Sequence, residues 1–503
     1  MKYIDRAGNQ RRIIVTYSMA EKQKSLKFNA FMNILLTAST FIFPFITFPY
    51  VTRVLQPEGT GKIAFANSVI NYFVMIASLG IPTYGIRACA KVRDNKDELS
   101  KTVQEIATIN FLMVVVSYIL LIITIIIVPR LWMIRKLLIV CSSTILLNFI
   151  GTEWLYKSLE CYTYITFRSI IIKICALILM FLFVRNANDC TIYAAISVFA
   201  NAGYGICNIF QIKKNIYTSK RYHLELKRHI KPIFIFFAMS IAVTIYSNVD
   251  ATMLGFMSGD AEVGYYDVAV KIKVILVNVV TALGTVLLPR ASYYIENNQT
   301  DEFKRISEKA IEFVSVVSIP LIVSFMLLAD RCIIFISGNE YIPSIQPMRI
   351  ILLTLFFIGM SNITGIQMLV PLGKEKVVLY SEIAGAVIDV ILNLLFIPIL
   401  GASGAATGTV VAEATVLTIQ MYALGRSAFN ILKSTQWLKI LIGIAFAVIW
   451  ILISEQFIHL NIFIELIVLF AGFYIVYVIM LLIFKESIVL SIVQTIKNYI
   501  RNL

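Results

Sequence analysis

Several ionisable residues lie inside stretches of the chain that are otherwise strongly apolar. They include three lysines and five carboxylates: Lys173, Lys271, Lys273, Asp250, Asp267, Glu382, Asp389 and Glu413. Ionised groups are costly in hydrocarbon, so such residues usually face a polar cavity or pair with an opposite charge. Amines in a cavity suit a phosphate or sugar-acid ligand, whereas carboxylates suit protons or cations. The chemistry indicated is therefore ligand binding and ion coupling.

The candidates for lining a ligand cavity are basic and amide side chains: Arg53, Asn67, Asn71, Arg87, Lys173, Lys271 and Lys273. Asn67 and Asn71 are four residues apart and share one face of a helix. Other interpretations stay open for some of the basic residues. Lys271 follows Asp267 by four residues and suits a local ion pair. Arg53 and Arg87 lie close enough to the ends of apolar stretches for their side chains to reach water.

The candidates for ion coupling are the carboxylates Asp250, Asp389 and Glu413. A second interpretation stays open, in which these groups are structural partners of the intramembrane lysines. The sequence predicts no catalytic residue, metal site or cofactor. Its seven cysteines form no CxxC pair, its three histidines have no metal-ligand spacing, and it contains no GxxxxGK[S/T] nucleotide-binding loop.

The elements that must position these residues are long apolar stretches. Most are about 20 residues long, which is the length of a helix that crosses about 30 Å of hydrocarbon. Fourteen such stretches are predicted: 28–50, 63–86, 103–128, 137–156, 164–184, 191–212, 232–257, 265–288, 310–329, 350–370, 377–399, 405–424, 440–457 and 462–484. With 59% hydrophobic and only 15% charged residues, the chain is a polytopic all-α membrane protein.

Basic residues alternate between the gaps that separate these stretches. Of the 44 Lys and Arg residues, 32 lie in the even-numbered gaps and the two tails, 8 lie in the odd-numbered gaps and four lie inside stretches. The positive-inside rule then predicts that both termini are cytoplasmic. The net charge of +15 belongs mostly to loops that face anionic lipid, and it does not indicate nucleic-acid binding. Translation starts at either Met1 or Met19, and the sequence leaves this open.

The chain repeats weakly at an offset of 203 residues. Gly61 falls on Gly264, each after an acidic loop, and Arg87 falls on Arg290. Six predicted spans separate the copies, so they share one orientation and form a parallel repeat. The predicted organisation is a cytoplasmic segment (1–27), an N-lobe of six spans (28–212), a basic cytoplasmic linker (213–231), a C-lobe of six spans (232–424), two extra spans (440–484) and a cytoplasmic tail (485–503).

Several motifs resemble those of bacterial oligosaccharide flippases of the Wzx type. The first is PYVTRVLQPEGTGKIAFA at 49–66, followed by SLGIPTYGIR at 78–87. In the second half NVDATMLG at 248–255, GYYDVAVKI at 264–272 and LGASGAA at 400–406 are similar to it. The resemblance covers about residues 25 to 485. These flippases belong to the multidrug/oligosaccharidyl-lipid/polysaccharide exporter superfamily.

The resemblance implies a two-lobed helical bundle with a cationic cavity in the bacterial cytoplasmic membrane. The implied substrate is an undecaprenyl-pyrophosphate-linked sugar repeat, moved from the inner to the outer leaflet for O-antigen, capsule or exopolysaccharide. The implied partners are this lipid-linked glycan, membrane lipids, and a polysaccharide polymerase with its chain-length proteins. The site residues named above come from this sequence and are not transferred from the family.

Three alternative functions stay open. A drug/cation antiporter of the same superfamily would have an acid-dominated cavity. A flippase for lipid-linked peptidoglycan precursors would share both the fold and a basic cavity. A membrane glycan polymerase or ligase is more remote, because no gap between the predicted spans exceeds about 20 residues and the half-repeat is typical of transporters.

Overall fold

The computed structural model describes residues 3–4, 10–11, 26–218, 220, 222–282, 284–425, 432–433, 435–458 and 460–501. Over these residues the fold is almost entirely helical, and the predicted all-α membrane class is confirmed. The exception is a short antiparallel pair of strands, β1 (Tyr3–Ile4) and β2 (Gln10–Arg11). Met19 lies outside the described residues.

The helices of the first half of the chain are α1 (Leu26–Ser78), α2 (Ile81–Ala90), α3 (Lys96–Ile127), α4 (Pro129–Met133), α5 (Arg135–Gly151), α6 (Glu153–Ser158), α7 (Tyr162–Phe183), α8 (Cys190–Ala202) and α9 (Tyr204–Asn215). The second half begins with α10 (Lys227–Met257), α11 (Asp260–Thr281), α12 (Gly284–Glu296), α13 (Thr300–Leu327), α14 (Ala329–Ser337) and the 3-10 helix η1 (Asn339–Ser344). It continues with α15 (Ile345–Ile351), α16 (Thr354–Ser361), the π-helical η2 (Asn362–Leu369), α17 (Glu375–Leu400), α18 (Ala402–Leu424), α20 (Trp437–Phe457), α21 (Ile462–Ile483) and α22 (Ser487–Arg501).

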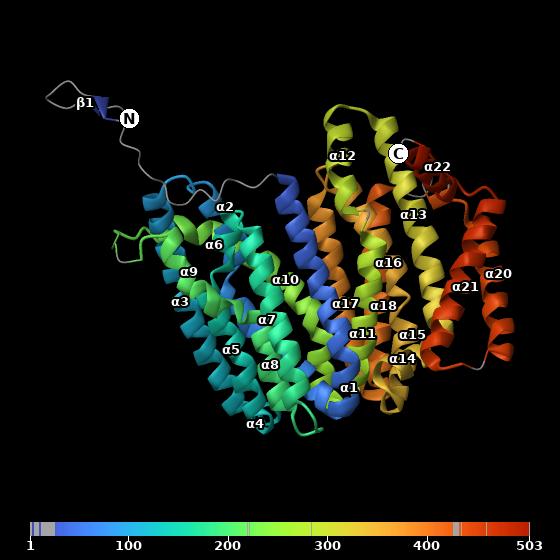
Figure 1. Cartoon of the computed structure of the whole chain (residues 1–503), viewed down its shortest axis with the longest axis horizontal. Coiled ribbons are helices and arrows are strands. Elements are labelled where there is room, and N and C mark those ends of the chain that lie inside the picture. The colour runs from blue at the N-terminus through green and yellow to red at the C-terminus, as the bar shows by residue number, and fades with distance from the viewer. Residues whose placement is uncertain are drawn as a thin grey trace.

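The two halves of the chain lie side by side. Figure 1 shows α2 to α9 on one side and α11 to α21 on the other, with α1 and α10 between them. Both chain ends lie at the same end of the bundle, which we call the terminal end. The opposite end, where α4, α14 and the bend of α1 lie, is the distal end.

The predicted count of fourteen spans is not confirmed. Twelve helical stretches of described residues are long and apolar enough to cross a membrane. The first two predicted spans form one stretch, Phe31–Ala90, because α1 continues through its bend at Gln56. The predicted stretch 265–288 falls on α11 and α12, and neither is among the twelve. Five charged residues lower the apolarity of α11: Asp260, Glu262, Asp267, Lys271 and Lys273.

The backbone repeats at the offset found in the sequence. Gln56 inside α1 has φ 63° and ψ 170°, and Gly259, which is 203 residues later, has φ 95° and ψ 179°. This conformation breaks the helix in both halves, within α1 and between α10 and α11. It is nearly exclusive to glycine, so Gln56 adopts it at a cost of about 1–3 kcal/mol. The two-helix unit that bends at Gln56 therefore recurs as α10 and α11.

The linker before α10 runs along the start of α3. Asn95 caps α3 by accepting hydrogen bonds from the backbone N–H groups of Asp97 and Glu98. The first turns of α3 after this cap bind the described residues of the linker (216–226) along one face. Lys101 forms an ion pair with Glu225 at 2.6 Å, and the Ser100 hydroxyl accepts a bond from the Tyr217 N–H at 2.9 Å.

The first turn of α10 is held by the first half of the chain. His229 is buried between the Tyr84 hydroxyl, 2.6 Å from its Nδ1, and the Glu105 carboxylate, 2.8 Å from its Nε2. Arg228 also donates to Glu105, which is itself fully buried. Further along, α10 bonds to the second half instead, since Asn393 of α17 donates to Asp250 at 2.7 Å. Helix α10 is therefore shared by the two halves.

One arginine of the second half bonds to both of the extra helices, α20 and α21. Arg331 of α14 donates to Glu455 of α20 at 2.7 Å and to Glu465 of α21 at 2.8 Å. Glu465 is the one acidic residue in the predicted stretch 462–484, and its bond to Arg331 accounts for a charge in an otherwise apolar helix.

The repeated backbone conformation predicts opposite effects for two substitutions. Gly259→Ala should lower the free energy of unfolding by about 1–3 kcal/mol through backbone strain alone, since no atom lies within 4 Å of the added Cβ position. Gln56→Gly should raise it by relieving the same strain. Thermal unfolding of the purified variants in one detergent measures both effects. A Gly259→Ala protein as stable as its parent would contradict the argument.

Candidate functional site

A cavity of about 610 Å³ lies between the two halves of the chain. Its walls come from α1 and α8 of the first half and from α10, α11, α16 and α18 of the second. Four of the seven predicted binding residues line it: Asn67, Asn71, Lys271 and Lys273. Two of the three predicted coupling residues, Asp250 and Glu413, line it as well.

The other predicted site residues lie elsewhere. Arg53 donates to the Phe335 carbonyl at 2.6 Å at the distal end, and Arg87 is exposed in the last turn of α2. Lys173 on α7 donates to the Ser39 hydroxyl of α1 at 3.1 Å, within the first half. Asp389 is buried within the second half and is not in the cavity wall. The structure thus separates these four side chains from the cavity.

The two lysines of the cavity have different surroundings. Lys271 forms an ion pair with Asp267 at 2.5 Å, and its ammonium lies 4.2 Å from the centre of the Phe48 ring. The local ion pair and the cavity position, considered as alternatives from the sequence, therefore occur together. Lys273 lies near enough to Asp250, Asp389 and Glu413 for their charges to act on it.

The buried carboxylate of Asp250 is held by three side chains of the second half. Tyr266 donates its hydroxyl to this carboxylate, Asn393 donates to it at 2.7 Å and Thr409 donates to it at 3.0 Å. Together with the Tyr266–Thr409 contact at 3.1 Å, these bonds join α10, α11, α17 and α18 at one point. They fix the orientation of the Asp250 carboxylate beside the cavity.

Two buried oxygens next to Asp250 have no hydrogen-bond partner among the described residues. They are Oδ1 of Asp389 and Oδ1 of Asn393. Both lie beside Gly408, where an added Cβ would be 3.1 Å from the first oxygen and 2.7 Å from the second. Unpaired oxygens inside a protein are costly, and their convergence with Asp250 is suited to a proton or a small cation.

The third carboxylate, Glu413, accepts a hydrogen bond from the Tyr246 hydroxyl. The charges in the cavity wall are therefore mixed, with two lysines against the carboxylates of Asp250, Asp267 and Glu413. The most frequent polar side chain in the wall is instead asparagine: Asn67, Asn71, Asn201, Asn248 and Asn278. Each amide offers both donors and an acceptor, which is the pattern that sugar hydroxyls require.

Sequence reasoning missed Tyr246, Tyr266, Asn393 and Thr409. Helical spacing could have indicated two of them, because Asn393 follows Asp389 by four residues and Thr409 precedes Glu413 by four. The two tyrosines gave no such signal, since an aromatic residue in a membrane helix is usually part of the packing.

The distal end of the cavity is closed by a contact between equivalent residues of the repeat. A Cβ atom at Gly61 would overlap the carbonyl oxygen of Asp260, and one at Gly264 would overlap the carbonyl oxygen of Pro57. Pro57 and Asp260 are themselves related by the offset of 203 residues. The two halves therefore meet across a pseudo-twofold axis at which neither helix has room for a side chain.

Polar contacts surround this glycine crossing. Arg130 of α4 forms an ion pair with Asp260 of α11 at 2.6 Å, and Thr60 bonds to the Tyr341 hydroxyl at 2.7 Å. Deeper in the cavity, Asn71 donates to Asn248 at 2.9 Å. Each bond joins the first half to the second, so the cavity is sealed at the distal end in this conformation.

A family model described as "Polysaccharide biosynthesis protein" matches residues 26–295, which is more than half of the chain. A second model, MatE, matches residues 235–395. A protein named "Putative O-antigen transporter" from Escherichia coli (strain K12) is 23% identical over 406 residues, covering 80% of this chain and 97% of that protein. Its namesake from Shigella dysenteriae is 25% identical over 405 residues, covering 79% of this chain and 100% of that protein.

Among solved structures, "Lipid II flippase MurJ, inward closed conformation" has a similar fold, with a TM-score of 0.70. It is 17% identical and covers 92% of this chain and 100% of that one. An inward-facing multidrug transporter of the MATE family has a TM-score of 0.54 and 13% identity, covering 81% of this chain and 96% of that one.

The glycine crossing predicts that Gly61→Ala shifts the protein toward a conformation open at the distal end. The added methyl group cannot coexist with the Asp260 carbonyl in the closed conformation. A membrane-impermeant maleimide added from outside should label a Ser197→Cys reporter in the cavity several-fold faster in this variant. The chain without the reporter gives the background.

Gly59→Ala is the matched control for this experiment. Its Cβ would meet the Cys190 sulfur at 2.9 Å, which rotation of that side chain can relieve, and Leu55 Cβ at 3.1 Å, and both contacts lie within the first half. Equal labelling in the parent, Gly59→Ala and Gly61→Ala chains would refute the role of the crossing in closure.

Proposed function

This chain belongs to the family of polysaccharide biosynthesis proteins, and we propose that it is a flippase for undecaprenyl-pyrophosphate-linked oligosaccharide repeat units. The resemblance to the polysaccharide exporter superfamily noted in the sequence is confirmed by the family and fold matches. The proposed direction is from the inner to the outer leaflet of the bacterial cytoplasmic membrane, for surface polysaccharide synthesis. The relatives named as O-antigen transporters support this substrate class.

The observation that carries the proposal is a polar cavity enclosed between two repeated halves. A glycan and a pyrophosphate cannot cross hydrocarbon unaided, because their polar groups would lose their hydrogen bonds with water. The five asparagines of the cavity wall replace those bonds for sugar hydroxyls. Lys271 and Lys273 supply positive charge for the phosphates.

The closed distal end indicates from which side of the membrane the substrate would enter the cavity. With both termini in the cytoplasm, as the positive-inside rule predicts, the glycine crossing lies toward the periplasm. The cavity then receives substrate from the cytoplasmic side. Release requires the bonds between the halves at the distal end to break, while new contacts form at the terminal end. This is alternating access by movement of one half against the other.

The buried carboxylates are the proposed coupling site. Asp389 and Asn393 direct unpaired oxygens toward Gly408, next to Asp250. Binding of a proton or cation there would change the charge opposite Lys273, and thereby the positive field that a pyrophosphate meets in the cavity. Glu413 with its Tyr246 bond is the remaining coupling candidate.

Two transporter alternatives have specific support. A drug/cation antiporter is favoured by the carboxylates of the cavity wall, which outnumber the lysines. A flippase for a lipid-linked peptidoglycan precursor is favoured by the fold shared with the lipid II flippase. The amide-rich wall and the family match favour the oligosaccharide substrate over the first alternative. Partnership with a polysaccharide polymerase and its chain-length proteins is part of the proposal and rests on the family alone.

Lys273→Gln tests the phosphate contact. Removing this amine should lower surface polysaccharide about tenfold or more in a deletion strain, because hydrogen bonds to charged groups contribute about 1.5–3 kcal/mol. The matched control is Lys173→Gln, whose amine lies in the same membrane but bonds to Ser39. Immunoblots verify equal protein levels. Normal polysaccharide with both variants would rule out the lysine as a substrate contact.

Asp389→Asn tests the coupling site. The variant keeps the size of the side chain but cannot ionise, so flipping driven by an imposed ion gradient should fall at least about tenfold. Exchange of substrate between leaflets without a gradient should continue. Reconstituted vesicles with a fluorescent lipid-linked sugar measure both rates. A flux that responds normally to proton and sodium gradients would remove Asp389 from the coupling mechanism.

A further inference from the structure

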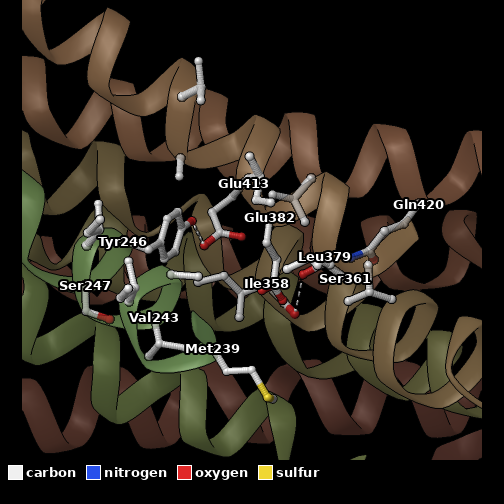
Figure 2. Close-up of a pocket in the computed structure, with 18 of the residues that line it drawn as sticks. Met239, Val243, Tyr246, Ser247, Ile358, Ser361, Leu379, Glu382, Glu413 and Gln420 are labelled. Atoms are coloured by element: carbon white, nitrogen blue, oxygen red, sulfur yellow. Dashed lines mark hydrogen bonds between the residues drawn. The ribbon is translucent and has the colours of Figure 1, made fainter. Parts of the chain in front are cut away.

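A second, larger cavity opens beside the central one and is almost wholly apolar. Its volume is about 1110 Å³, and it lies between α10 and α17, with α16, η2 and α18 behind it. We call it the lateral slot, bounded by residues 235–247 of α10 and 378–391 of α17. Figure 2 shows its wall, with Met239 and Val243 of α10 facing Leu379 of α17.

The slot is long, narrow and aliphatic. At 1.5 Å of rise per residue, its two sides extend about 18 Å along α10 and about 20 Å along α17. From Ile235 to Ile245, all lining residues of α10 are apolar. Val243 remains 63% exposed and Val387 of the opposite wall 52% exposed, so the slot is open along its length. These dimensions suit an extended hydrocarbon chain.

The slot and the central cavity share part of their walls. Tyr246, Ser247, Ile358 and Glu413 line both. The hydrogen bond from Tyr246 to Glu413, visible in Figure 2, lies at this junction. An amphiphile can therefore place its polar head in the central cavity and its apolar tail in the slot. The head then stays out of hydrocarbon and the tail stays out of water.

We infer that the lateral slot holds the polyprenyl tail of the lipid-linked substrate while the sugar and pyrophosphate occupy the central cavity. This inference rests on the proposed function and assigns a separate site to the second part of the same molecule. In the slot the tail keeps an apolar environment on all sides, like that of the bilayer from which it comes. The route of the tail from the polar cavity to the bilayer then stays apolar throughout.

One polar residue in the slot needs an explanation. Glu382 lies seven residues after the start of α17, about 10 Å along its axis. With Ser361 and Gln420, it makes the wall opposite α10 more polar toward the terminal end. The tail therefore lies against α10 and the aliphatic residues Ile383 and Val387. A carboxylate in an apolar cavity also suits a lipophilic cation, and the experiment separates the two occupants.

The test is binding of undecaprenyl phosphate, which has the tail but no sugar. Native mass spectrometry of the purified full-length protein, in excess phosphatidylglycerol, measures the bound fraction. Ala386→Trp, which fills the slot from α17, should weaken binding several-fold, because the tail loses its van der Waals contacts with the slot wall. Leu394→Trp is the matched control, because Leu394 is an exposed residue of the same helix outside the slot.

Val243→Trp fills the slot from the opposite wall. It provides an independent test in case the Ala386→Trp protein does not fold. Loss of binding in both slot variants, with equal melting temperatures and intact binding in Leu394→Trp, supports the inference. Equal binding in all four proteins overturns it, and so does equal loss in all three variants. Binding of tetraphenylphosphonium that disappears in Glu382→Gln and displaces no undecaprenyl phosphate also overturns it, and assigns the slot to cations.

These outcomes are independent of the proposed substrate head. If deletion of the gene left surface polysaccharide unchanged, the proposed function would fail, while slot-dependent binding of undecaprenyl phosphate would still establish a polyprenyl site. If the polysaccharide were lost but the slot variants bound the tail normally, the function would stand and the tail site would be wrong.

Discussion

The conformation of this protein depends on two glycines that meet where its halves cross. Gly61 and Gly264 each press against a carbonyl group of the other half, at Asp260 and Pro57. Because both glycines and both carbonyl groups are related by the internal repeat, one backbone geometry serves the two sides of the contact. Helices can approach this closely only without side chains. The approach brings Arg130 within reach of Asp260 and Asn71 within reach of Asn248, and so determines where the cavity ends.

The wall of the central cavity contains both positive and negative side chains, and neither sign predominates strongly. Lys271 already has a partner in Asp267, and Lys273 faces carboxylates that are engaged elsewhere, by Tyr266 at Asp250 and by Tyr246 at Glu413. The phosphate of the proposed substrate would have to compete with the Lys271–Asp267 ion pair. Such competition would allow an anionic head to bind and also to leave, as the proposed transport requires.

The sequence predicts the helices well because membrane spans are long and apolar. It also predicts the repeat, whereas the bend that the two copies share was seen only in the structure. The offset of 203 residues, seen at Gly61 and Gly264, recurs in the backbone angles of Gln56 and Gly259. Neighbours between helices are harder to predict. Lys173, Arg53 and Arg87 carry the same positive charge as Lys273. Periodicity indicates only the face of a helix on which a residue lies, and not which residues of other helices it contacts. Lys173 consequently bonds to Ser39 within one half, while Lys273 reaches the cavity.

The charged residues near the cavity were easier to identify from the sequence than the tyrosines that bond to them. Asp250 and Glu413 are conspicuous in apolar stretches, whereas the tyrosines that bond to them are ordinary in such helices. The fourteen-span count is not confirmed among the described residues, partly because α11 carries five charged residues, which makes it less apolar than a simple span.

Helix α10 has a mechanical consequence for the cycle. Its first turn is bound to α2 and α3 through His229, and Asp250, about two turns before its end, is bound to α17 and α18. Neither half can therefore rotate as a free rigid body, because α10 is clamped at two points that belong to different bodies. In the proposed cycle, rotation of one half against the other would have to twist or bend the segment of α10 between these two contacts. The stiffness of this segment would then contribute to the free-energy barrier between the conformations that open at the distal end and at the terminal end.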